Sequence, residues 1–253
     1  MPLPKTIDQV IDQLDQIIEA EMAVQSPLAY FATLYREVTI QVKEGIQKGN
    51  FEDGERMEKL DVIFASRYLE AYHRYQNGQT TSQCWTIAFA AAKDKGIIIL
   101  QHLLLGINAH IDLDLGIAAA ETAPSADLPA LKTDFENINK ILYELIPTVQ
   151  ERLGSVSPLL SWFDRLGGMR DEQLAHFGLG LSRQHAWRLA TLLAPLPQTS
   201  WALIIETTDQ ATSLLAQHIR RPKTWLARKF IQLIAFFESK DLNKNVKALK
   251  PAN

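Results

Sequence analysis

The stretch that decides the fold is 96-GIIILQHLLLGINAHIDLDLGIAAAE-121, which is mostly apolar and contains no lysine or arginine. Ile99, Leu103, Ile107 and Ile117 follow helical spacing, at about 100° per residue, and therefore share one face of a helix. The uncharged part of the stretch is shorter than the roughly 20 apolar residues that a membrane span needs. We therefore predict a buried central helix and no membrane span.

The segments on both sides of this helix carry the same period and clear boundary signals. Thr6 begins one amphipathic stretch, Ser26 and Pro27 begin a second, and Asn77 and Gly78 end a third. No window alternates with period two for long enough to predict a strand. The sequence predicts an all-α protein, a single bundle of nine or ten helices around the buried central helix.

Composition is that of an ordinary globular protein, with 47% hydrophobic and 22% charged residues in a chain of 253. The single cysteine, Cys84, cannot form an internal disulfide or a cysteine-based zinc site. The N-terminus lacks the basic start and apolar run of a signal peptide. These features predict a cytoplasmic location.

Charge is distributed unevenly along the chain. Residues 220–253 contain nine Lys/Arg against Glu238 and Asp241, a local balance of nine minus two, whereas the rest of the chain is acidic. An acidic body disfavours general nucleic-acid binding, so we expect no nucleic-acid partner. We expect residues 1–239 to form the helical domain and 240–253 to be a polar basic tail that adds little core.

The segment before that tail allows two interpretations. An apolar stripe of Leu226, Phe230, Leu233, Ile234 and Phe237 runs beside Arg228 and Lys229. Such a helix either packs its stripe onto the bundle or lies on a membrane surface. We favour packing onto the bundle.

A carboxylate interrupts the apolar stripe of the third predicted helix. At about 100° per residue, Met57, Leu60, Phe64 and Tyr68 share one face, and Asp61 falls inside it. A buried carboxylate is costly unless it is paired, hydrogen-bonded or bound to a metal. Asp61 is therefore a candidate site residue.

The central helix repeats this anomaly, because His110 and Asp114 share one face and lie about 6 Å apart along the axis. The pair can bind one divalent ion, and a catalytic metal site needs roughly three protein ligands. Asp61 is the best third ligand, followed by Asp134 and Tyr35. Alternatively, the same groups form a buried polar network that fixes helix packing without an ion.

Three segments carry a resemblance to a known family: MEKLDVIFASRYLEAY (57–72), LLLGINAHIDLDLGIA (103–118) and DFENINKIL (134–142). The second is the most specific, through its N-A-H-I-x-x-D-L pattern. The chain resembles a bacterial family of uncharacterised proteins of unknown function, whose members often carry a second histidine where this chain has Leu113. The resemblance brings no known activity and implies that one constellation contains Asp61, Asn108, His110, Asp114, Asp134 and Asn137.

Two functional hypotheses follow. The first is a divalent-metal-dependent hydrolase of unknown substrate, with Asp61, His110 and Asp114 as ligands and with Asp134 or Tyr68 assisting proton transfer. The second is a non-enzymatic helical module that binds a small ligand or a partner. No glycine-rich phosphate loop is visible, so no nucleotide cofactor is expected.

Overall fold

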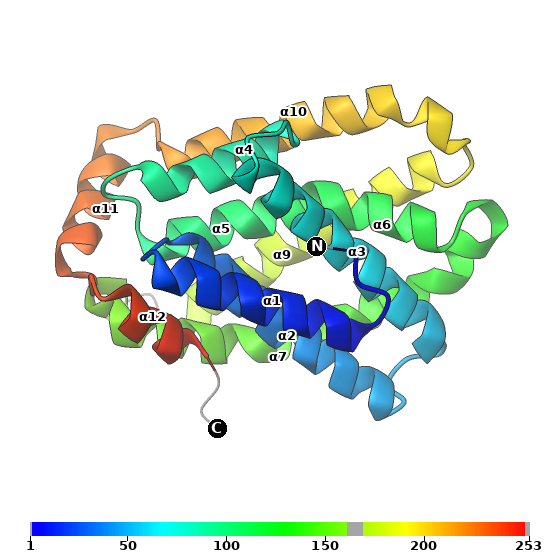
Figure 1. Cartoon of the computed structure of the whole chain (residues 1–253), viewed down its shortest axis with the longest axis horizontal. Helices are drawn as coiled ribbons and strands as arrows, with labels where there is room; N and C mark the ends of the chain where they lie inside the picture. The colour runs from blue at the N-terminus through cyan, green and yellow to red at the C-terminus, as the bar shows by residue number, and fades with distance from the viewer. Residues whose placement is uncertain (1, 161–168, 251–253) are drawn as a thin grey trace.

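The computed structural model describes residues 2–160 and 169–250, without the side chains of 169–177, and every regular element in these ranges is helical (Figure 1). This confirms the all-α prediction. The described α-helices are α1 (Ile7–Ala23), α2 (Leu28–Gln47), α3 (Gly54–Gln76), α4 (Gln83–Ala90), α5 (Ile99–Ala109), α6 (Leu115–Thr122), α7 (Leu128–Val156), α9 (Met169–Leu193), α10 (Ala202–Arg220), α11 (Trp225–Phe237) and α12 (Leu242–Leu249).

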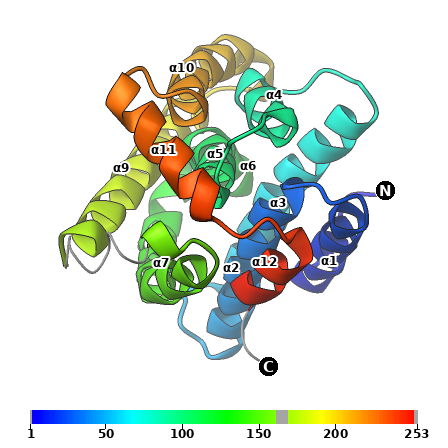
Figure 2. The ribbon, with the colours of Figure 1, turned by 90° about the vertical axis from the view of Figure 1, so that its left-hand side faces the viewer.

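The predicted central helix is present. A five-residue π-helical segment, η2 (His110–Asp114), joins α5 to α6, so one rod runs from Ile99 to Thr122. Viewed end-on, this rod lies in the middle of the bundle (Figure 2), where α2, α4 and α10 pack against α5 and where α3 and α9 pack against α6. Its surroundings explain why the rod is apolar on nearly every side.

Two glycines let neighbouring helices approach this rod closely. A Cβ atom added to Gly116 would lie 2.6 Å from the carbonyl oxygen of Ala186 in α9, and one added to Gly106 would lie 2.3 Å from the ring of Phe31 in α2. Both distances are far below van der Waals contact. Glycine at these two positions therefore sets how α2 and α9 pack.

Polar side chains on the side of the rod that faces α10 form hydrogen bonds to that helix. Asn108 donates through Nδ2 to the carbonyl oxygen of Thr212 at 3.1 Å, and Gln101 donates to that of Ile219 at 2.6 Å. These bonds satisfy carbonyl groups of a neighbouring helix. They show that this polar stripe links helices.

By length and composition, the rod is also a candidate membrane span. Of its apolar 18-residue segment, 78% is buried inside the protein. The core helix of a soluble protein meets the same criterion, so the match is weak evidence for a span. Within the described residues, one helix meets this criterion of length and composition.

The C-terminal segment differs from the prediction. Residues 242–249 form α12, which begins at the capping residue Asp241 and packs against α2 and α7. Leu242, Val246 and Leu249 are buried in the main core. The expectation that this segment adds little core is wrong, because two helical turns bring all three apolar residues onto a single face.

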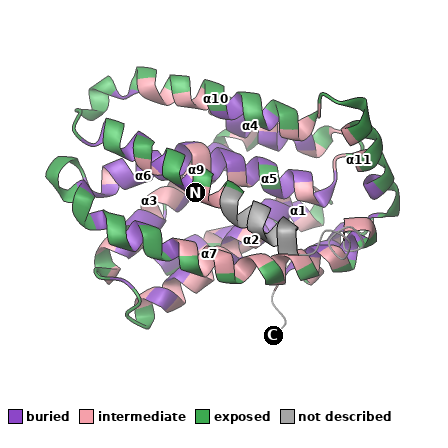
Figure 3. Cartoon of the chain, turned by 180° about the vertical axis from the view of Figure 1, so that it is seen from behind, coloured by how far each residue is buried: buried purple, intermediate pink, exposed green. Residues whose placement is uncertain are grey.

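The preceding helix, α11, is more exposed than predicted. Ile234 and Ala235 of α11 are buried, whereas Leu226, Leu233 and Phe237 of the predicted packing stripe are exposed. Figure 3 shows the outer face of α11 as exposed surface at one end of the bundle. The packing prediction is therefore confirmed for Ile234 and wrong for Leu226, Leu233 and Phe237.

Candidate functional site

A cavity of about 280 Å³ lies inside the bundle. Its walls come from α2, α3, the central rod, α7 and α9, and most of the side chains that line it are apolar. Four ionisable side chains interrupt these walls, namely Tyr35, Asp61, His110 and Arg183.

The π-helical segment determines how the central rod presents its polar residues. Within η2 the N–H of Leu115 donates to the carbonyl oxygen of His110, a five-residue step that widens the helix by one residue. Single π-helical turns of this kind occur frequently at functional sites. A uniform α-helical step of about 100° per residue does not reveal this turn in the sequence.

His110 joins the cavity to a buried carboxylate. Its ring stacks on Phe64 with a centroid distance of 3.6 Å, and its Nδ1 lies 3.3 Å from Oδ2 of Asp114. Burial lowers the pKa of His110, although Asp114 opposes this shift. The ring is therefore neutral, and a proton on Nδ1 that faces Asp114 leaves Nε2 as an acceptor. Nε2 has no hydrogen-bond partner among the described residues.

Both carboxylate oxygens of Asp114 accept hydrogen bonds. Its Oδ2 also accepts a hydrogen bond from Nε1 of Trp85 at 2.8 Å, and its Oδ1 accepts one from Nε of Arg67 at 3.0 Å. Asp114 does not line the cavity. It therefore orients His110 from behind, as carboxylates that hold a histidine ring do. No sequence pattern marks Arg67 or Trp85, since only the folding of α3 and α4 onto the rod brings them to Asp114.

Asp61 is buried without such support. Only 7% of its surface is exposed, and its Oδ2 has no hydrogen-bond partner in the described part of the chain. Burial, with a smaller contribution from Glu58, raises the pKa of this carboxyl group to about 7. Near neutral pH, Asp61 therefore exists in both protonation states.

Tyr35 provides a third polar group without a partner. Its ring centroid lies 4.4 Å from that of His110, and its hydroxyl makes no hydrogen bond to the described residues. The nearby Thr39 hydroxyl donates to the backbone carbonyl of Tyr35 instead. Burial, followed by the charge of Asp61, raises the pKa of Tyr35 well above its usual range. The phenol is therefore a neutral donor and acceptor.

Arg183 enters the cavity wall from α9 and was missed in the sequence analysis. It is buried, donates through Nη2 to the carbonyl oxygen of Phe135, and stacks 4.4 Å above the Phe135 ring. No carboxylate of the described residues pairs with it, and its Nε is unpartnered. Burial lowers its pKa to about 10. No local signal marks this residue, because arginine is ordinary on the surface of a helix.

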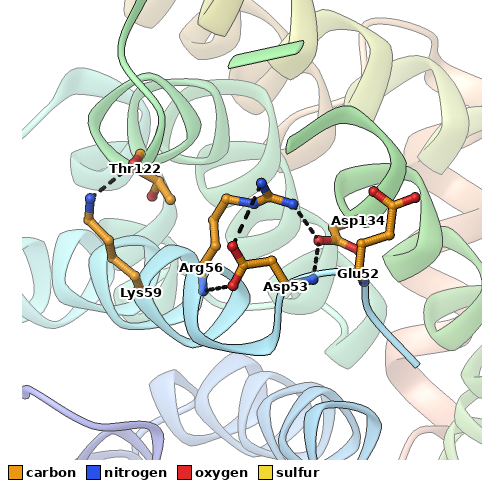
Figure 4. Close-up of polar contacts among 6 residues, drawn as sticks. All are labelled: Glu52, Asp53, Arg56, Lys59, Thr122 and Asp134. Carbon is orange, nitrogen blue, oxygen red and sulfur yellow. Dashed lines mark hydrogen bonds and ion pairs between the residues drawn. The ribbon is translucent and has the colours of Figure 1, made fainter. Parts of the chain in front are cut away.

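Asp134, a predicted catalytic residue, lies in a different place (Figure 4). It is fully buried and accepts hydrogen bonds from the backbone N–H groups of Glu52 (2.7 Å) and Asp53 (3.1 Å) and from Nη2 of Arg56 (2.8 Å). These contacts anchor α7 to the start of α3. Asp134 does not line the cavity.

The structure therefore does not gather the implied constellation at one point. Tyr68 is buried behind the cavity, with its ring centroid 6.1 Å from His110, while Asn137 is exposed and Asn108 faces α10. Within residues 2–160 and 169–250, no three His, Cys, Asp or Glu side chains form a group that could hold a metal ion. Asp61 and His110 do share the cavity.

Comparison with known proteins gives a family and no activity. No curated protein and no solved structure matches this chain. A family model matches residues 7–222, which include every helix that lines the cavity and end before α11. This chain belongs to a family of unknown function, DUF5995.

Proposed function

We propose that the cavity binds a small, mainly apolar molecule that carries a hydroxyl or carboxyl group. One observation carries this proposal: Asp61 Oδ2, His110 Nε2 and Tyr35 Oη are buried, have no hydrogen-bond partner among the described residues, and belong to residues that line one apolar cavity. An unpaired buried polar group costs about 1–3 kcal/mol, and native proteins leave few of them. A ligand that hydrogen-bonds to these atoms removes this cost.

The four polar groups also restrict the head group. Neutral His110 accepts through Nε2, while the Tyr35 hydroxyl both donates and accepts. Arg183 has no acidic partner among the described residues and suits an anionic oxygen. A volume of about 280 Å³ is near the lower end of the range for ligand pockets, about 300–1,000 Å³. A carboxylic acid with a short alkyl chain fits these groups: its ionised form accepts from Arg183 and Tyr35, and its protonated form donates to His110.

The test measures binding of octanoate, 1-octanol and methyl octyl ether by calorimetry. We expect octanoate, through its anionic oxygens at Arg183, and octanol, through its hydroxyl group, to bind more tightly than the ether, which has neither an anionic oxygen nor a donor. Asp61→Asn and Arg183→Met should weaken binding, and Glu70→Gln, an exposed position on the same helix as Asp61, is the matched control. If all three compounds bind equally, or none binds, the proposal is wrong.

Mass spectrometry of solvent extracts from the purified protein provides an independent test. We expect an amphiphilic compound to be recovered from the wild type and to be depleted in Asp61→Asn. Recovery from both proteins in equal amounts would show that the compound is bound elsewhere.

Ester hydrolysis is a second candidate, and the pairing of His110 with Asp114 favours it. A histidine held by a carboxylate through Nδ1 can accept a proton from water at Nε2, and such general-base catalysis contributes about 10²–10⁴-fold in rate. Under this proposal, His110→Gln abolishes hydrolysis of short-chain nitrophenyl esters while Glu70→Gln retains it. A wild type that is inactive on a broad ester panel argues against hydrolysis.

The metal-dependent form of this reaction stays a prediction. Both oxygens of Asp114 already accept hydrogen bonds, so Asp61 and His110 are the two predicted ligands with an unpartnered atom. This donor set fits a neutral polar ligand better than a divalent ion, which needs roughly three protein ligands. Metal analysis of protein purified without affinity resin tests it directly. One equivalent of bound metal that is lost in Asp61→Asn would support the metal-dependent reaction.

A further inference from the structure

The outer face of α11 is an exposed apolar surface that the cavity does not explain. Trp225 is 65% exposed and Phe236 is 78% exposed, and Leu226, Leu233 and Phe237 are exposed between and beside them. Large exposed apolar patches on soluble proteins usually mark a contact with another molecule or a membrane.

These residues form one continuous strip along the helix. At about 100° per residue, Trp225, Leu233 and Phe236 point to the same side of α11, opposite the buried Ile234. The helix therefore rests on the bundle by a narrow face and presents a wide apolar face outward, at one end of the molecule (Figures 1 and 3).

Positive charge surrounds this strip. The segment 220–237 contains five basic residues and no acidic residue, and Lys229 lies within the strip itself. Arg220 and Arg221 share Asp94 as a partner, whereas no ion pair involves Lys223 or Lys229 in the described residues. The neighbouring Glu238 is buried and accepts from the backbone of the central rod, so it does not neutralise the surface.

A hollow beside the start of α11 concentrates these cations. It measures about 440 Å³, and Arg220, Arg221, Lys223 and His218 line it. A basic hollow next to exposed aromatic side chains matches the two parts of an anionic lipid, the head group and the upper acyl chain.

We propose that α11 and this hollow bind the surface of a membrane that contains anionic lipids. The apolar strip lies in the interfacial region, with Trp225 and Phe236 inserted among the lipids, and the basic residues contact the phosphate groups. A symmetric contact between two copies is disfavoured, because it would bring the two basic surfaces together. The residues of the strip and of the hollow do not line the proposed cavity, so this surface is separate from the cavity ligand.

The experiment is vesicle co-sedimentation of the full chain. One set of vesicles contains phosphatidylcholine only, and the other contains about one third phosphatidylserine. We expect binding to the anionic vesicles to be at least tenfold tighter, because each basic residue near an anionic surface strengthens binding about fivefold. Equal or undetectable binding to both sets would overturn the proposal.

Two pairs of variants separate the apolar and the basic contributions. Trp225→Ser/Phe236→Ser should lose binding, whereas Leu203→Ser is the matched control, because Leu203 is 73% exposed at the far end of α10. Lys223→Glu/Lys229→Glu should lose the preference for anionic lipid, whereas Lys132→Glu on α7 should retain it.

Light scattering of the same variants tests the alternative that a second copy of the chain covers the strip. All substituted positions are exposed, and thermal unfolding establishes that the variants are folded. A monomeric wild type supports the membrane surface. A dimer that Trp225→Ser/Phe236→Ser dissociates would instead show that a second copy covers the strip, and would overturn the proposal.

Discussion

Asp61 and Asp134 are both buried carboxylates, and their surroundings are opposite. Asp134 accepts three hydrogen bonds, one of them from Arg56, and joins two helices. Asp61 lines an apolar cavity, and its Oδ2 has no described partner. A buried carboxylate with a complete set of donors stabilises the fold, while one without donors is held in place at a cost. Missing partners, more than burial itself, distinguish a candidate site from a structural contact.

The largest expected effect comes from removing the satisfied carboxylate. Asp134→Ala leaves two backbone N–H groups and Arg56 without their acceptor, so we expect the free energy of unfolding to fall by about 3–5 kcal/mol. Urea unfolding at neutral pH measures this change. A loss below about 1 kcal/mol, the size of an ordinary exposed pair, would break the distinction between the two aspartates.

Asp61→Asn should have the opposite sign, and its effect should depend on pH. The folded-state pKa of Asp61, about 7, lies above its usual value, so the folded protein binds this proton more tightly than the unfolded chain does. The stability of the wild type should therefore fall as pH rises from about 4 to 7 and stay level above that. At pH 8 we expect Asp61→Asn to be more stable by about 2–4 kcal/mol, with little difference at pH 4.

Unfolding curves of both proteins across this pH range test the prediction. Glu70→Gln on the exposed side of the same helix should follow the wild type. The free energy of unfolding of Asp61→Asn and of the wild type could instead show the same pH dependence. In that case the Asp61 carboxyl group has a hydrogen-bond partner in solution, as Asp134 does.

Asp114 provides an intermediate case, since it is satisfied like Asp134 and adjoins the cavity through His110. Asp114→Ala strands the indole N–H of Trp85 and the ring of His110, and we expect a loss of about 2–3 kcal/mol. Arg67 is partly exposed and can be hydrated again. An unchanged melting temperature would show that these contacts contribute nothing to the fold.

The cavity wall itself can be tested at Gly106. A methyl group there collides with the ring of Phe31, which must move toward the cavity, so Gly106→Ala should destabilise the protein by about 1–3 kcal/mol and weaken octanoate binding.

Gly178→Ala in α9 is the matched control for this substitution. Among the described residues an added Cβ has no atom within 4 Å at that position, so the variant should gain about 0.5–1 kcal/mol from helix propensity. Equal effects at the two glycines would show that the contact with Phe31 is not limiting.

The local sequence was sufficient to predict the helices and the faces that carry the site. Helical period depends on residues three and four apart, so the stripes of α3 and the central rod could be derived directly. They placed Asp61, His110 and Asp114 correctly on buried faces. The same arithmetic could not show that Asp61 and Asp114 have different neighbours.

What the sequence by itself determined is therefore the helical class, the buried central helix and the polar residues that interrupt its stripes. Only the tertiary structure decided that Arg67 and Trp85 satisfy Asp114, that Arg183 enters the cavity, that α12 is packed and that α11 is exposed. The physical reason is that a stripe reports which side chains of one helix share a face. The atoms opposite that face belong to segments far away in the chain, and they decide whether a polar group is paired and whether an apolar one is covered.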